Sequence, residues 1–110
     1  MTIDNLRAFG ADVDAGLTRC LNKEDFYLML VNKAREDKKL TELAQQLNDK
    51  NLDAAFETAH ALKGMYANLS LTPLTEPVSK MTELLRSRTD TDYSALMQEA
   101  QTQFEKLCSL

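Results

Sequence analysis

The chain contains a single histidine, His60, which is the clearest candidate for chemistry in the sequence. Imidazole titrates near neutral pH, so an exposed histidine presents an unprotonated ring nitrogen without the help of a general base. No serine or cysteine stands at a spacing that would orient this imidazole in a hydrolase site. The sequence therefore favours nucleophilic attack by His60 itself and disfavours a His-dependent hydrolase.

Two residues about one helical turn after His60 bear on what it could carry. Lys63 lies on the same side of a helix, so its flexible stem can bring an ammonium group beside a dianionic phosphoryl group. Gly64 stands in mid-helix, where glycine costs about 1 kcal/mol relative to alanine. Either a neighbouring helix packs tightly against Gly64, or the missing side chain lets another protein approach the imidazole. The sequence leaves both explanations open.

Helical periodicity places His60 on an exposed strip, about 100° around the helix from the centre of its apolar arc. Taken singly, a surface histidine, a solvated lysine and a packing glycine are the commoner interpretations of such residues. Their joint spacing favours a phosphoryl carrier that docks a partner protein through this strip. The residues that share the strip are Asp53, Glu57, Gly64, Ala67 and Asn68, and we expect the last four of these to contact the partner.

The run from His60 to Leu69, HALKGMYANL, resembles the signature of the histidine-containing phosphotransfer (HPt) domain. In that signature His, Leu, Lys, Gly and a later Asn occur at these intervals. The segment from Gly10 to Cys20 is also similar to the stretch that precedes the second helix in many bacterial members, so the resemblance covers nearly the whole chain. Ser70 departs from the pattern, because glycine is common at its position.

The resemblance implies a phosphorelay protein whose histidine accepts a phosphoryl group from a receiver-domain aspartyl phosphate and passes it to another receiver. It implies that His60 is the acceptor, that Lys63 stabilises the phosphate and that Gly64 gives access. The implied partners are response-regulator receiver domains and a hybrid histidine kinase. We expect Mg²⁺ on the receiver, and no cofactor or metal site on this chain. Without a phosphate-cradling glycine loop, we expect a phosphocarrier with no kinase activity of its own.

The elements that must position this site are helices. Leu, Ala, Lys, Glu and Gln are frequent, whereas the chain has 3 Gly, 2 Pro and no Trp. The sequence therefore predicts an all-α fold, an up-and-down antiparallel four-helix bundle with an additional short N-terminal helix. The whole chain, residues 1–110, is expected to form one domain and to be monomeric.

Apolar residues recurring at helical intervals place the individual elements. The helix that carries His60 should be capped by Asp53 and should pack through Phe56, Ala59, Leu62 and Tyr66. Pro77 predicts either a kink in the next helix or a start near Glu76, rather than a regular helix from a Thr72 cap and Pro73. The other expected helices are a short one beginning at Asp12, one over about Lys23 to Asp37 with a bend near its end, one over Leu40 to Leu47, one ending near Arg88, and a last one capped by Asp90 or Asp92.

Charge and composition argue against several other classes of protein. Seventeen acidic against thirteen basic residues give a formal charge of −4, so nucleic acid is not expected as a partner. The apolar stretches are far shorter than the roughly 20 residues that span a bilayer, so we expect a cytoplasmic protein with no membrane contact. Cys20 and Cys108 are expected to be reduced packing residues. A phosphorylation-independent helical interaction module, in which His60 is incidental, is the alternative function.

Overall fold

The computed structural model describes all residues 1–110 and consists of helices joined by short connections, with no strand. None of these helices combines the length and apolar character needed to cross a bilayer. The predicted all-α class is confirmed. The seven helices are α1 (Ile3–Phe9), α2 (Val13–Arg19), α3 (Glu24–Glu36), α4 (Lys39–Asn48), α5 (Leu52–Asn68), α6 (Thr72–Arg86) and α7 (Ser94–Cys108).

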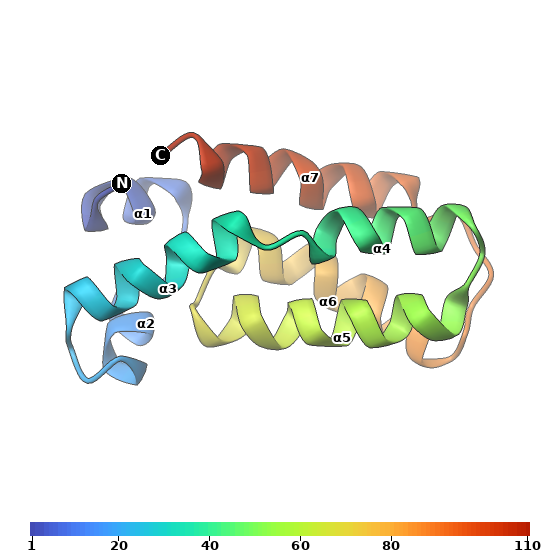
Figure 1. The fold of residues 1–110 in the computed structure, drawn as a ribbon, viewed down its shortest axis with the longest axis horizontal. Helices are drawn as coiled ribbons and strands as arrows, with labels where there is room; N and C mark the ends of the chain where they lie inside the picture. Colours follow the sequence, from blue (N-terminus) through green and yellow to red (C-terminus); the bar gives the residue numbers. More distant parts are fainter.

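The helices from α3 to α7 form the predicted up-and-down antiparallel bundle (Figure 1). Helices α3 and α4 lie end to end and form its first limb, and α5, α6 and α7 then run back and forth along the same long axis. Helix α5 packs against both α4 and α6, and α6 packs against α7. The predicted bend between α3 and α4 lies at Asp37, whose backbone is extended and whose Oδ1 accepts the N–H of Lys39 at 2.8 Å.

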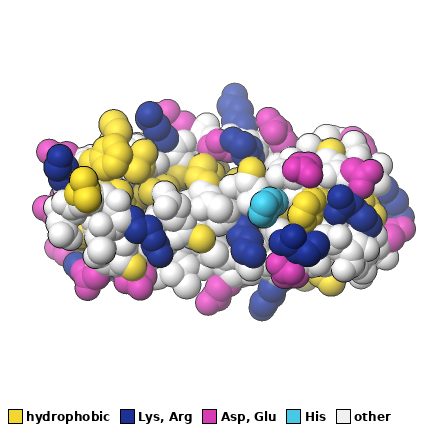
Figure 2. All heavy atoms as spheres, turned by 90° about the horizontal axis from the view of Figure 1, so that it is seen from below, with side chains coloured by type: hydrophobic (Ala, Val, Ile, Leu, Met, Phe, Trp, Pro, Cys, Tyr) yellow, Lys and Arg dark blue, Asp and Glu magenta, His cyan; other side chains and the backbone are white.

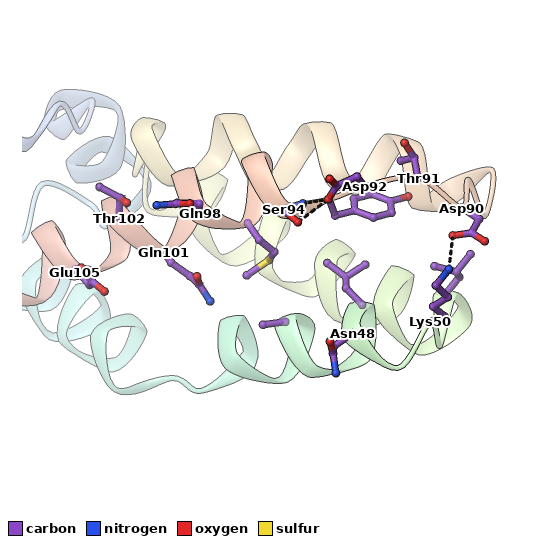
Figure 3. A pocket seen from close by; sticks show the side chains of 15 residues that line it. Asn48, Lys50, Asp90, Thr91, Asp92, Ser94, Gln98, Gln101, Thr102 and Glu105 are labelled. Carbon is purple, nitrogen blue, oxygen red and sulfur yellow. Dashed lines mark hydrogen bonds and ion pairs between the residues drawn. The ribbon is translucent and has the colours of Figure 1, made fainter.

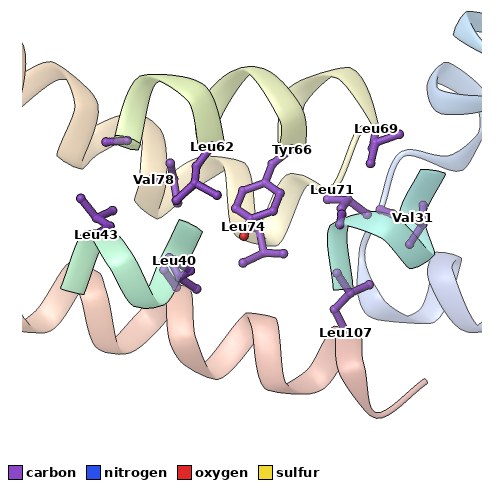
Figure 4. Packing of buried hydrophobic residues seen from close by; sticks show 14 of the residues in the cluster. Val31, Leu40, Leu43, Leu62, Tyr66, Leu69, Leu71, Leu74, Val78 and Leu107 are labelled. Atoms are coloured by element: carbon purple, nitrogen blue, oxygen red, sulfur yellow. The ribbon is translucent and has the colours of Figure 1, made fainter. Parts of the chain in front are cut away.

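The core of the bundle is a continuous apolar cluster, and α5 contributes a full stripe to it (Figure 4). Ala59, Leu62 and Tyr66 are buried, as the periodicity predicts. Phe56 packs against the cluster but is only partly buried, because it lies at the edge of the stripe. Because this face of α5 is held in the core, the side chains on its other faces point toward the surface of the bundle.

The N-terminal region holds two short helices, whereas the sequence analysis predicted one. Thr2 caps the additional helix α1: its Oγ1 accepts the Asn5 N–H at 3.1 Å, and Asn5 Oδ1 accepts the Thr2 N–H at 3.1 Å. Gly10 ends it in the left-handed conformation, with φ 110°. The cap and the terminal glycine are sequence signals that an apolar periodicity alone overlooks, because only Leu6 of this helix is buried.

The predicted N-caps of α5 and α7 both differ from the residues that the structure places there. Asn51, not Asp53, caps α5, since its side chain accepts the Ala54 N–H at 3.3 Å. Asp53 lies in the first turn of α5, where a negative charge faces the positive end of the helix dipole. The N-cap residue of α7 is Tyr93, which makes no side-chain capping bond, so the predicted cap at Asp90 or Asp92 is wrong. Asp92 precedes the N-cap, and its Oδ1 accepts the Ser94 N–H at 2.9 Å.

Helix α6 begins earlier than Pro77 seemed to allow, and the predicted start near Glu76 is wrong. Leu71 occupies the N-cap position, so Thr72 is the first helical residue and not the cap. Pro77 lies buried inside the helix. Pro77 is the sixth helical residue and has no N–H to donate to the carbonyl oxygen of Pro73, so the helix lacks one backbone hydrogen bond there. Burial of its ring adds apolar contact that offsets this loss. The helix ends at Arg86, two residues before the predicted end.

The two cysteines occupy different environments. Cys20 is buried in the core cluster, as expected for a packing residue. Cys108 is exposed at the end of α7, with its Sγ 3.7 Å from the carbonyl oxygen of Arg35, so its assignment as a packing residue is wrong. Both thiols are free.

Gly16 fills the tightest contact between α2 and α3. A Cβ at this position would lie 2.6 Å from Cε1 of Tyr27 and 2.9 Å from its hydroxyl oxygen. The Tyr27 ring is fully buried, and its hydroxyl donates to the carbonyl oxygen of Leu69 at 2.8 Å. The ring therefore cannot retreat without giving up a buried hydrogen bond.

We expect Gly16→Ala to destabilise the protein by roughly 1–3 kcal/mol, the usual cost of overpacking. Thermal unfolding followed by circular dichroism measures the effect. Gly64→Ala is the matched control, because a Cβ at Gly64 would meet nothing within 4 Å. Equal melting temperatures for the two variants would contradict the packing described for Gly16.

Candidate functional site

His60 lies on the surface of α5, on the border next to the buried stripe. Its neighbour Ala59 is fully buried, whereas the His60 side chain is exposed. Figure 2 shows this face of the molecule, with His60 as the one cyan side chain. The exposed position agrees with the strip on which the helical periodicity places it.

Phe56, about one turn before His60 on α5, holds the imidazole in a stack. The two ring centroids are 5.7 Å apart, and the ring planes differ by 7°. Because Phe56 also packs against the core cluster, the stack connects the exposed imidazole to a fixed part of the bundle. The spacing of these two residues is visible in the sequence, but the sequence analysis treated Phe56 only as a core residue.

Two arginines from the C-terminal end of α6 and the turn after it surround Phe56. The guanidinium carbon of Arg86 lies 5.3 Å from the Phe56 ring centroid, and that of Arg88 lies 4.7 Å from it. Arg88 is held in place, since its Nε donates to Asp53 Oδ1 at 2.7 Å and its Nη1 donates to the Leu85 carbonyl oxygen at 2.9 Å. The sequence analysis missed both arginines, because no local pattern connects them with His60.

Lys63 is partly buried, and its ammonium pairs with Glu83 of α6. Its Nζ lies 3.5 Å from Glu83 Oε1, while Arg86 Nε lies 3.4 Å from Glu83 Oε2. The hydrogen bond from Arg86, the charge of Arg86 and the smaller effects of Lys63 lower the pKa of Glu83 below its usual value. Lys63 therefore has a carboxylate as its partner in the structure, and its predicted role beside a phosphoryl group on His60 stays a prediction.

Gly64 is exposed, and no atom lies within 4 Å of the place where its Cβ would be. The explanation of this glycine by tight helix packing is therefore wrong. The other residues of the predicted docking strip are also at the surface: Glu57 and Asn68 are exposed, and Ala67 is partly buried. Open space thus lies over the turn that follows His60.

The end of α5 is tied to α2 by Arg19, which the sequence analysis did not identify. Its Nη1 donates to Ser70 Oγ at 2.6 Å and to the carbonyl oxygens of Ala67 at 3.3 Å and Asn68 at 3.4 Å. Ser70 is in the left-handed region with φ 56°, which explains why glycine is common at this position in the family that the sequence resembles. These contacts fix the end of the strip on which His60 lies.

The charged side chains of the site form ion pairs: Lys63 and Arg86 contact Glu83, and Arg88 contacts Asp53. Lys and Arg side chains lie on either side of His60 in Figure 2, although the net charge of the chain is −4. The exposed imidazole stacks on Phe56, the ring that Arg86 and Arg88 contact, and Lys63 lies about one turn further along α5. This arrangement suits a dianionic group that becomes attached to a ring nitrogen. No three His, Cys, Asp or Glu side chains lie together in a group that could hold a metal ion.

A separate groove of about 950 Å³ lies between α4 and α7 (Figure 3). Lys50 and Asp90 pair across one end of it at 3.7 Å. Most of the side chains that line it are polar, and none belongs to the His60 site. The candidate chemistry is therefore at the open surface of α5 and not in this groove.

Comparison with known proteins gives one result. The family model described as the Hpt domain matches residues 25–109. The matched range contains almost all of α3 and all of α4 to α7, including His60 and the side chains of α5 and α6 described around it, whereas α1 and α2, with Arg19, precede it. Neither the curated proteins nor the solved structures gave a match to this chain.

Proposed function

The chain belongs to the Hpt domain family, whose role is phosphotransfer in phosphorelays, and from this premise we propose that His60 is the residue that carries the phosphoryl group. The donor in this proposal is the aspartyl phosphate of a receiver domain, and the acceptor is an aspartate of a second receiver. A hybrid histidine kinase supplies the phosphoryl group to the first receiver. The observation that carries the proposal is the exposed imidazole of His60, stacked on Phe56, with open space over Gly64.

The reacting atom of this chain is the outer ring nitrogen of His60, Nε2. The lone pair of Nε2 forms the N–P bond while the O–P bond to the receiver's aspartate breaks, and the aspartate keeps the electron pair of that bond. Phosphoryl transfer has a loose transition state, so alignment and charge neutralisation matter more than covalent assistance. The Phe56 stack supplies alignment of the imidazole, and Lys63 supplies positive charge. Mg²⁺ belongs to the receiver in this scheme.

The docking surface in this proposal is the strip around Gly64. Small side chains at Gly64 and Ala67 let the receiver bring its aspartyl phosphate to the imidazole. Glu57 and Asn68, both exposed, border the same strip and are proposed to contact the receiver. The direct test is incubation with a receiver loaded by a small acyl phosphate, followed by assay for acid-labile phosphate on this chain. Binding of phosphorylated receivers without any labelling would instead indicate a phosphorylation-independent interaction module.

Lys63→Ala should slow transfer from a phosphorylated receiver by about tenfold, which corresponds to about 1.4 kcal/mol in the barrier. The reason is that Lys63 neutralises a doubly charged group, an effect somewhat larger than that of an ordinary exposed ion pair. Rapid-quench measurement of the transfer rate gives the effect. Lys80→Ala is the matched control, because Lys80 is exposed on α6 and forms no ion pair. A rate that Lys63→Ala leaves unchanged at low and high salt would remove Lys63 from the mechanism.

A further inference from the structure

Glu83 is placed between the two cations that could serve a phosphoryl group on His60. One carboxylate oxygen lies 3.5 Å from Lys63 Nζ, and the other lies 3.4 Å from Arg86 Nε. Lys63 is about one turn from His60 on α5, and Arg86 lies over Phe56, the ring that stacks on the imidazole. One acidic side chain thus contacts a cation of α5 and a cation of α6, and the second of these lies over the ring that stacks on the acceptor residue.

A phosphoryl group on His60 would compete with Glu83 for these cations. The phosphoryl group carries up to two negative charges and three acceptor oxygens, whereas Glu83 carries one charge and two oxygens. Each cation that moves to the phosphoryl group must first give up its contact with Glu83. The stability of the phosphorylated form is lower by the free energy of the contacts that are lost.

We propose that Glu83 competes with the phosphoryl group for Lys63 and Arg86. This competition weakens the interaction of both cations with the phosphoryl group and keeps the group transferable. This inference rests on the proposed role of His60 as the phosphoryl carrier. A carrier must release what it binds, and an unopposed pair of cations would favour retention. Glu83 is therefore a residue that sets the transfer equilibrium, and it makes no contact with the reacting atoms.

The test variant should fold normally. The Glu83 side chain is 58% exposed, and exposed ion pairs contribute little to stability. Glu83→Gln keeps the shape of the side chain and removes its charge. Glu76→Gln is the matched control, because Glu76 is exposed on the same helix and forms no ion pair.

The measurement is the equilibrium constant for exchange of the phosphoryl group between N-phosphoimidazole and His60, monitored by ³¹P NMR. The equilibrium is approached from the unphosphorylated and from the phosphorylated protein. The N–P bond of the small molecule breaks as the N–P bond to His60 forms, and free imidazole is released. Because the same kind of bond is broken and made, the equilibrium constant reports the protein surroundings of the phosphoryl group. No receiver domain is needed for this measurement.

We expect Glu83→Gln to raise this equilibrium constant by roughly threefold to tenfold, the combined effect of two exposed ion pairs, whereas Glu76→Gln should leave it unchanged. The difference should shrink in about 1 M salt, which screens exposed charges. It should vanish in a Lys63→Ala, Arg86→Ala background, where Glu83 has no cation to withhold.

Two results would overturn the inference, and a third would overturn the proposed function on which it rests. An equilibrium constant that Glu83→Gln leaves unchanged or lowers would show that Glu83 does not compete. If Glu83→Gln raised the equilibrium constant equally in the Lys63→Ala, Arg86→Ala background, Glu83 would act by direct charge repulsion of the phosphoryl group and not by competition for cations. Failure of the wild-type chain to take up any phosphoryl group at His60, from phosphoimidazole or a receiver, would be a failure of the proposed function itself.

Discussion

His60→Gln is expected to abolish phosphoryl uptake from a phosphorylated receiver, with labelling below detection. The lone pair of a carboxamide nitrogen is delocalised into the carbonyl group, so glutamine cannot form the N–P bond that imidazole forms. The fold should be retained, because His60 is exposed and its only aromatic partner is Phe56. Substitutions at such surface positions usually change stability by no more than about 0.5 kcal/mol.

The experiment compares wild type, His60→Gln and the Glu76→Gln control in the same receiver mixture. Acid-labile phosphate on the chain is measured after separation from the receiver, and thermal unfolding is recorded for each variant. Retained labelling of a normally folded His60→Gln protein would place the phosphoryl group on another residue and reject the central proposal. Loss of labelling in Glu76→Gln as well would indicate that the assay reports surface charge rather than the acceptor.

Gly64→Gln is expected to separate function from stability, with transfer from a receiver reduced at least a hundredfold, a loss of roughly 2.7 kcal/mol. A side chain at this position would occupy the open space over the turn that follows His60. Stability should stay unchanged or rise by up to about 1 kcal/mol, because glutamine is the better helix former and nothing lies where its Cβ would be placed. The informative result is therefore a large fall in the rate of receiver transfer together with an unchanged or higher melting temperature.

A small phosphodonor provides the internal control for Gly64→Gln. Phosphoramidate needs no docking surface, so it should phosphorylate His60 of this variant at a rate within a few-fold of wild type. Gly64→Ala, with only a methyl group, should give an intermediate rate with the receiver. Normal receiver transfer by Gly64→Gln would remove Gly64 from the docking surface, and a clear loss of stability would contradict the open position of this residue.

Several features of this protein follow from the sequence alone. The frequent helix formers and the apolar periodicity determine an all-α chain, because helix propensity and amphipathicity are local properties. The rotation per residue of a helix also determines that His60 and Gly64 share a side of α5 that points away from Leu62 and Tyr66. The Hpt signature around His60 is likewise contained in one helix, so its spacing could be read without the fold.

Local sequence patterns predict the helices of this chain better than they predict the residues at which those helices begin. Asn51 and Asp53 are both good capping residues, and the structure uses the first of them. Propensity alone does not choose between two such caps, since the choice depends on where the helix must begin to bury its stripe. Pro77 is a helix breaker by local rules, yet burial in the core keeps it within α6.

Only the tertiary structure decided what surrounds the imidazole. Glu83, Arg86 and Arg88 reach the site because α6 packs antiparallel to α5, and the register of that packing is set by side chains distributed along both helices. The tertiary structure also distinguished two glycines that are both within predicted helices: Gly16 of α2 lies against the Tyr27 ring of α3, and Gly64 of α5 faces open space. A helical periodicity gives the direction of a side chain from its own axis, but the identity of the neighbour in that direction depends on the whole bundle.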